Sequence, residues 1–70
     1  MSTLYQLNGQ NFEGEPKAAF GELFLYARDL PLGDYKVWQE WKLTFILHVE
    51  KELLFFLNAH TGLIEGIEPK

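Results

Sequence analysis

Residues 35–58 constrain the fold of this chain more than any other stretch. They contain both tryptophans and three of the six phenylalanines. Seven of the eight odd-numbered residues from Tyr35 to Val49 are apolar, and six of the eight even-numbered residues from Lys36 to Glu50 are polar. Such period-two alternation is typical of a β-strand with one buried face and one wetter face. We therefore predict one long strand from residue 35 to residue 49, with its odd positions in the core.

A helix is the rival interpretation of this segment, because Trp38, Trp41 and Phe45 also recur at near-helical spacing. A helix would, however, spread four other apolar side chains around its circumference, namely Val37, Leu43, Ile46 and Leu47. The segment is also rich in the β-branched and aromatic residues that favour strands. Because a straight strand of this length is unusual, we expect a bend or a bulge near residues 39–40.

Two further strands are predicted after the long one. Glu50 and Lys51 form the expected turn, and residues 52–58 form a partner strand that is apolar on both faces. A strand of that composition is expected to be central and covered on both sides. Asn58 and Gly62 bound a second turn, and residues 63–68 form a last short strand.

The run from Phe56 to Glu65 resembles the closing hairpin of PepSY-type domains, which carry an Asp-Ala-x-Thr-Gly-x turn. In this chain Asn58 stands where that turn has its acid. The resemblance covers ten residues and implies a hairpin at this place, and we transfer no function from it.

The residue pattern in the first part of the chain predicts a short strand and one helix. Residues 3–7 alternate weakly, and Asn8-Gly9 is the dipeptide that best forms a tight hairpin turn. Residues 10–13 are either a return strand or an irregular loop. Pro16 fits the first position of a helix ending near residue 29, and its apolar stripe consists of Phe20, Leu23, Phe24 and Ala27. Gly21 costs roughly 1 kcal/mol inside a helix, which we interpret as close approach of the helix to a sheet.

These elements predict an α+β fold in a single small domain over residues 1–70. One helix packs on a small antiparallel sheet in the order β-α-β-β-β, with or without an extra N-terminal hairpin. Pro31 and Gly33-Asp34 separate the helix from the strands that follow. Because one helix cannot cover both faces of the sheet, we expect another copy or another protein to bury part of the apolar surface.

Charge and composition exclude several classes of function. The formal charge of −4 disfavours nucleic-acid or anionic-membrane binding, since the six Lys and Arg residues form no basic run. The chain lacks cysteine, so thiolate metal sites and disulfides are excluded. Lys42, His48 and the Glu50–Glu52 charges interrupt the longest apolar stretch, and the N-terminus lacks the features of a signal peptide. We expect a cytoplasmic protein.

The sequence offers no catalytic constellation, and we predict that the protein is not an enzyme. The only serine is Ser2, and Thr61 beside His60 is interpreted as turn chemistry. His48 and Glu50 lie two apart on one strand face and form the one pair with metal-ligand spacing, although a solvated face explains them better. We predict no metal and no cofactor.

The interface prediction rests on Trp38 and Ile46, which alternate onto the polar face of the long strand. Their neighbours on that face include Lys36, Lys42 and His48. A tryptophan among charged residues is a common composition for the centre of a protein interface. We therefore predict a partner-binding site of Trp38, Ile46, Lys36, Lys42 and His48. Leu54 and Phe56 are expected to join this patch, and the alternative is that a bent strand buries Trp38 in the core.

We accordingly expect a non-enzymatic protein-binding module, a small inhibitor or adaptor of the type that phages and mobile elements encode. It would dock on a partner protein through the exposed sheet. The alternative is a structural homo-oligomer, such as a homodimer, with no separate ligand. Two lesser alternatives are a small enzyme using His48 or His60, and a nucleic-acid-binding protein that stacks bases on Trp38.

Overall fold

The N-terminal hairpin follows directly from the Asn8-Gly9 dipeptide. The computed structural model describes residues 2–70. Strands β1 (Thr3–Leu7) and β2 (Gln10–Gly14) pair antiparallel, and Asn8 and Gly9 between them adopt φ values of 51° and 82°. Positive φ at both central residues is what a tight hairpin turn requires. Of the two alternatives for residues 10–13, the return strand is therefore the one observed.

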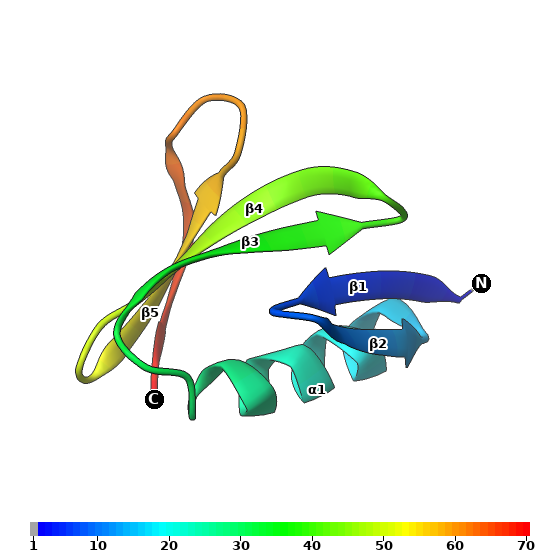
Figure 1. Cartoon of the computed structure of the whole chain (residues 1–70), viewed down its shortest axis with the longest axis horizontal. Helices are drawn as coiled ribbons and strands as arrows, with labels where there is room; N and C mark the ends of the chain where they lie inside the picture. Colours follow the sequence, from blue (N-terminus) through cyan, green and yellow to red (C-terminus); the bar gives the residue numbers. More distant parts are fainter. Residues whose placement is uncertain (1) are drawn as a thin grey trace.

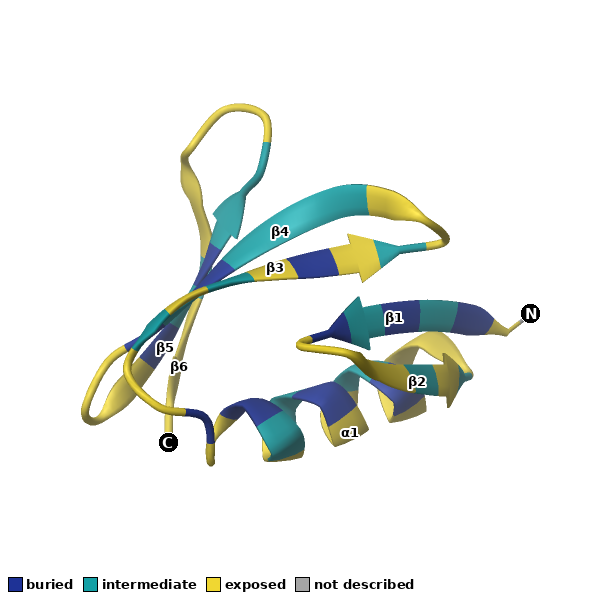
Figure 2. Ribbon diagram, in the orientation of Figure 1, coloured by how far each residue is buried: buried dark blue, intermediate teal, exposed yellow. Residues whose placement is uncertain are grey.

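Helix α1 (Pro16–Ala27) starts at the predicted proline and lies on one face of the sheet. It buries Ala19, Leu23 and Ala27, while Phe20 and Phe24 are half-buried against the core. Figure 1 shows α1 running along β1 and β2, and Figure 2 shows its buried positions on the side that faces these strands. The apolar side of the helix therefore packs against the sheet, as expected.

All six strands form one antiparallel sheet in the order β2-β1-β3-β4-β5-β6. After α1 come β3 (Gly33–Gln39), β4 (Lys42–Val49), β5 (Leu53–Asn58) and β6 (Ile64–Pro69). Strand β3 pairs with β1, and each of the three later strands pairs with the one before it. The predicted α+β architecture, with one helix packed on an antiparallel sheet, is confirmed. So are the turns at residues 50–51 and 58–62.

The prediction of a single strand from residue 35 to residue 49 is wrong. Glu40 and Trp41 form a tight turn, with φ values of 51° and 67°, and divide the segment into β3 and β4. Neither residue is a preferred turn former. Trp41, predicted as core, is 72% exposed at this turn.

A β-bulge explains why the alternation continues across the turn. Across the turn, Gln39 pairs with Lys42. An odd-numbered residue of β3 and an even-numbered residue of β4 therefore share a face next to the turn. The register then shifts between Val37 and Trp38, and Val37 pairs with Phe45. One extra residue in β4 therefore restores the original parity. Beyond the bulge, the odd positions of both strands consequently face α1, as the alternation predicted. Leu43, which lies between the turn and the bulge, was predicted as core but pairs with Trp38 on the opposite face.

The core lies between α1 and one face of the sheet. Its largest fully buried side chains are Leu7, Leu23, Val37, Leu47, Val49 and Leu54. Strand β5 lies between β4 and β6 but is covered on one side only. Leu54 and Phe56 are buried on the helix side, so the expectation that they join the patch of Trp38 is wrong. Leu53, Phe55 and Leu57 alternate onto the opposite face.

Candidate functional site

The sheet face turned away from α1, called the open face below, carries three rows of directly paired residues. Opposed residues in antiparallel strands share a face, so the strand pairings define each row. The first row crosses from β2 to β4 and contains Asn11, Gln6, Trp38 and Leu43. The second crosses from β3 to β6 and contains Lys36, Ile46, Leu57 and Ile64. The third contains Asp34, His48, Phe55 and Ile67.

Four of the five predicted site residues come together on this face. Trp38 is 38% exposed, Lys36 is exposed, and Ile46 and His48 are half-buried. Lys42 is separated from them because it pairs with Gln39. The Gln39 amide Nε2–H donates to the buried Thr3 hydroxyl (3.4 Å), which places that pair toward the helix side.

The open face also contains residues that the sequence prediction missed. Together with the predicted Ile46, the missed residues Phe55, Leu57, Ile64 and Ile67 form a continuous apolar area over β4, β5 and β6, called the apolar band below. Ile64 and Ile67 are 55% and 52% exposed. The sequence contained a signal for this band: residues 52–58 are apolar on both faces, and α1 covers only one of them, so the other face must meet another apolar surface.

Both tryptophans line one groove where the β1–β2 turn meets β3, called the tryptophan groove below. Its volume is about 740 Å³. Half of the lining residues lie on the open face, and the others come from the two turns and from β1 and β3: Gln6, Leu7, Asn8, Gly9, Asn11, Asp34, Tyr35, Lys36, Trp38 and Trp41. The groove therefore joins the predicted residues Lys36 and Trp38 to Trp41, which the parity argument had assigned to the core.

Glu40 fixes the turn that carries Trp41. Its Oε1 accepts hydrogen bonds from the Leu4 backbone N–H (2.9 Å) and from the Thr3 hydroxyl (3.0 Å). Its own backbone N–H donates to the Leu4 carbonyl (3.0 Å). These contacts tie the β3–β4 turn to the start of β1. A tertiary anchor therefore holds two residues in a conformation that their own propensities do not favour.

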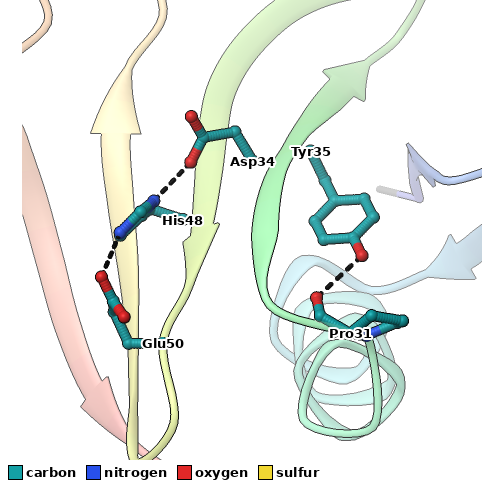
Figure 3. A network of polar contacts seen from close by, with 5 residues as sticks. All are labelled: Pro31, Asp34, Tyr35, His48 and Glu50. Carbon is teal, nitrogen blue, oxygen red and sulfur yellow. Dashed lines mark hydrogen bonds and ion pairs between the residues drawn. The ribbon is translucent and has the colours of Figure 1, made fainter.

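His48 lies between two carboxylates on the open face. Its Nδ1 contacts Asp34 Oδ1, and its Nε2 contacts Glu50 Oε1 at 2.5 Å. Figure 3 shows the two carboxylates on opposite sides of the imidazole ring. The hydrogen bond to Asp34, followed by the one to Glu50, raises the pKa of His48 above its ordinary value of 6.5. Only the doubly protonated imidazolium donates to both partners at once.

This arrangement has the chemistry of a surface ion-pair cluster. Each carboxylate faces a different ring nitrogen, so the three groups do not converge on one point where an ion would sit. Within residues 2–70, no group of three or more His, Cys, Asp and Glu residues has the geometry of a metal site. The Asp34–His48–Glu50 cluster also stands beside Phe55, whose ring centroid is 5.9 Å from that of His48.

The turn containing His60 and Thr61 has a conformational role. The Asn58 Oδ1 accepts from the backbone N–H groups of His60 (2.8 Å) and Thr61 (3.0 Å). Its Nδ2 donates to Glu65 across the hairpin (3.0 Å). This is the hydrogen-bonding pattern by which asparagine starts a turn, as the sequence interpretation expected.

In the part of the chain that the structure describes, no helix combines the length and the apolar character needed to span a bilayer. Comparison with known proteins gives no match to a family model, to a curated protein or to a solved structure.

Proposed function

We propose that this chain is a non-enzymatic protein-binding module that docks on a partner through the open face, as a small cytoplasmic inhibitor or adaptor. One observation carries the proposal: the face opposite α1 displays the apolar band next to two tryptophans. Trp38 and Trp41 are 38% and 72% exposed, and Ile67 is 52% exposed. An apolar surface of this kind, rimmed by polar residues, marks an interaction site.

The composition of the open face fits a protein partner. Tryptophan contributes disproportionately to binding energy at protein interfaces, and charged residues are depleted at their centres. Across β4, β5 and β6 the second and third rows contain the aliphatic and aromatic side chains of the apolar band, with Lys36 and Asp34 beside them on β3 and His48 on β4. The formal charge of −4 argues against a polyanionic partner.

The proposal of a non-enzymatic role rests on the contacts that the candidate polar residues already make. His48, the histidine on the open face, already contacts carboxylates at both ring nitrogens. The His60–Thr61 pair serves the Asn58 turn through its backbone. A nucleophile, its base and an orienting group at mutual hydrogen-bond distance would be needed for covalent catalysis, and Ser2, the only serine, lies outside every strand and helix.

Site-specific photo-crosslinking tests the proposal in the cells that naturally make the protein. A photoreactive phenylalanine analogue at position 55 places the probe in the apolar band, and the same analogue at position 25 places it on the outer side of α1, where Leu25 is 57% exposed. We expect a discrete protein adduct from position 55 and none from position 25. The captured protein must then bind the purified chain directly in calorimetry. Equal adducts from both positions would refute docking through the open face.

A homodimer is the second candidate, and the exposed apolar residues of the band favour it. Two sheets can pack face to face through their apolar faces, and a two-fold axis makes one such patch complementary to itself. Light scattering on the purified protein at high micromolar concentration separates the two candidates. A dimer mass supports the second candidate, and a monomer mass excludes it.

A further inference from the structure

The tryptophan groove lies beside the apolar band and has a different chemistry. Its two indoles offer flat apolar faces, and its rim carries the Gln6 and Asn11 amides and the Lys36 ammonium. Gln6 and Asn11 are directly paired across β1 and β2, and Gln6 is paired with Trp38 across β1 and β3. The polar and aromatic groups are therefore held on adjoining strands, in fixed register.

The lining is richer in hydrogen-bond donors than in acceptors. Indole N–H and ammonium groups only donate, whereas amides both donate and accept. The one carboxylate in the lining, Asp34, already contacts His48. A matching ligand must therefore present acceptors and apolar faces together. Sugar hydroxyls donate as often as they accept, and a phosphate backbone meets a chain whose formal charge is −4.

A polyproline II segment has the required chemistry. Its carbonyl groups make no internal hydrogen bonds, its prolines have no N–H, and its rings stack on aromatic side chains. Because the segment is extended before it binds, little conformational entropy is lost on docking. Aromatic-lined grooves are a recurrent means of recognising such segments.

The backbone at Trp41 is a second, independent observation. Its φ of 67° is a conformation that favours glycine, yet the turn places there an indole that is 72% exposed. A strained residue with little burial is poorly explained by stability, and such outliers concentrate where ligands bind. The turn thus presents an exposed indole in the lining of the groove.

We propose that the tryptophan groove binds an extended, proline-containing peptide segment that carries a basic residue, supplied by the partner protein. The basic residue follows from charge complementarity: the whole chain is acidic, and Glu13, which pairs with Leu4 on the open face, lies two residues along β2 from the groove residue Asn11. This inference rests on the proposed function and names the class of partner segment.

Intrinsic fluorescence provides the test, because Trp38 and Trp41 are the only tryptophans in the chain. The purified protein is titrated with a decaproline peptide flanked by arginines, and with a glycine–serine peptide of equal length and charge. We expect a saturable change in emission, confirmed by calorimetry, and about tenfold tighter binding of the proline peptide. Trp41→Gly should weaken that binding about tenfold or more, whereas Leu25→Ala on α1 should leave it unchanged.

Circular dichroism verifies that each variant is folded. If Trp41→Gly does not fold, Trp38→Phe serves as the second groove variant. Several results would overturn the inference: no saturable change at millimolar peptide, equal binding of the glycine–serine peptide, or saturable binding of cellohexaose or oligothymidine in place of the proline peptide. If position 55 still crosslinks a partner while the proline peptide fails, the peptide inference falls and the proposed docking through the open face stands.

Discussion

Trp41 combines a backbone conformation that costs stability with a side chain that is exposed to solvent. A positive φ costs an L-amino acid roughly 1–2 kcal/mol, and the indole recovers little of this by burial, since it is 72% exposed. Glycine removes the steric cost but loses roughly 0.5–1 kcal/mol through the entropy of the unfolded chain. We therefore predict that Trp41→Gly stabilises the fold by up to about 1 kcal/mol, measured by urea denaturation followed by circular dichroism.

Trp41→Ala is the matched control, because it removes the indole but keeps the Cβ atom that causes the steric cost. We expect no gain in stability from it. If alanine stabilises the protein as much as glycine, the backbone conformation at Trp41 is not the source of the effect. If both variants lose more than about 1 kcal/mol, the indole packs more strongly than its exposure indicates.

His48 makes stability depend on pH. Its pKa in the folded protein is raised above the ordinary value of 6.5, chiefly by the hydrogen bond to Asp34 and then by that to Glu50. The folded state therefore binds the proton more tightly than the unfolded state. This contribution is fully present below pH 6.5 and disappears as the pH rises through the raised pKa.

We therefore predict that the unfolding midpoint temperature falls between pH 6 and pH 9 more steeply in the native protein than in His48→Gln, as linkage requires. The control is His60→Gln, which should retain the native slope because His48 keeps both carboxylates. A native slope in His48→Gln would show that other groups cause the pH dependence. An NMR titration of the His48 ring protons gives the folded pKa directly.

At the scale of the element, the sequence predicted the helix, the turns and the strand character of residues 35–49. It missed the turn at Glu40-Trp41 for a physical reason. A two-residue turn reverses the parity of the faces, and the bulge in β4 reverses it again, so the alternation shows no interruption. The cause of the turn is tertiary, since Glu40 is anchored by Thr3 and Leu4. Local propensity contains no information about such a contact.

Gly21 is a second element-scale case. Its predicted reason, close approach of α1 to the sheet, is wrong: Gly21 is exposed, and a Cβ added there would meet no atom within 4 Å. We therefore predict that Gly21→Ala stabilises the protein by about 1 kcal/mol, since alanine favours the helix and restricts the unfolded chain.

Thermal and urea denaturation measure this effect. Leu23→Ala on the same helix provides the contrast, because Leu23 is fully buried and its truncation should cost about 2–5 kcal/mol. A destabilising Gly21→Ala would mean that this position on α1 meets another surface.

At the scale of the whole molecule, the sequence predicted the placement of Trp38 and Ile46 away from the core, but only part of the content of the open face. Trp38 and Ile46 were recognised because they interrupt a polar face. Phe55 and Leu57 could not be assigned to a face, since β5 is apolar throughout and its register depends on the turn at residues 50–52. Trp41 and Lys42 were misplaced because the turn and the bulge change faces locally. The location of a site on a sheet therefore depends on register, which short-range patterns do not determine.

The apolar band yields the last prediction, made with two adjacent residues of the edge strand β6. Ile67 pairs with Phe55 on the open face, and Glu68 pairs with the buried Leu54 on the helix side. Ile67→Lys should change the free energy of unfolding by less than about 1 kcal/mol, because Ile67 is 52% exposed. It should nevertheless weaken docking about tenfold or more, since it places a charge within the apolar band.

Glu68→Lys is the matched control: it changes the net charge by more than Ile67→Lys does, but on the other face of the same strand. We expect it to leave photo-crosslinking from position 55 unchanged, whereas Ile67→Lys should abolish it. Equal loss in both variants would mean that net charge, and not the apolar band, governs the contact. If both variants crosslink like the native protein, the contact around position 55 does not include Ile67, because a lysine at position 67 cannot enter an apolar interface without a large desolvation cost.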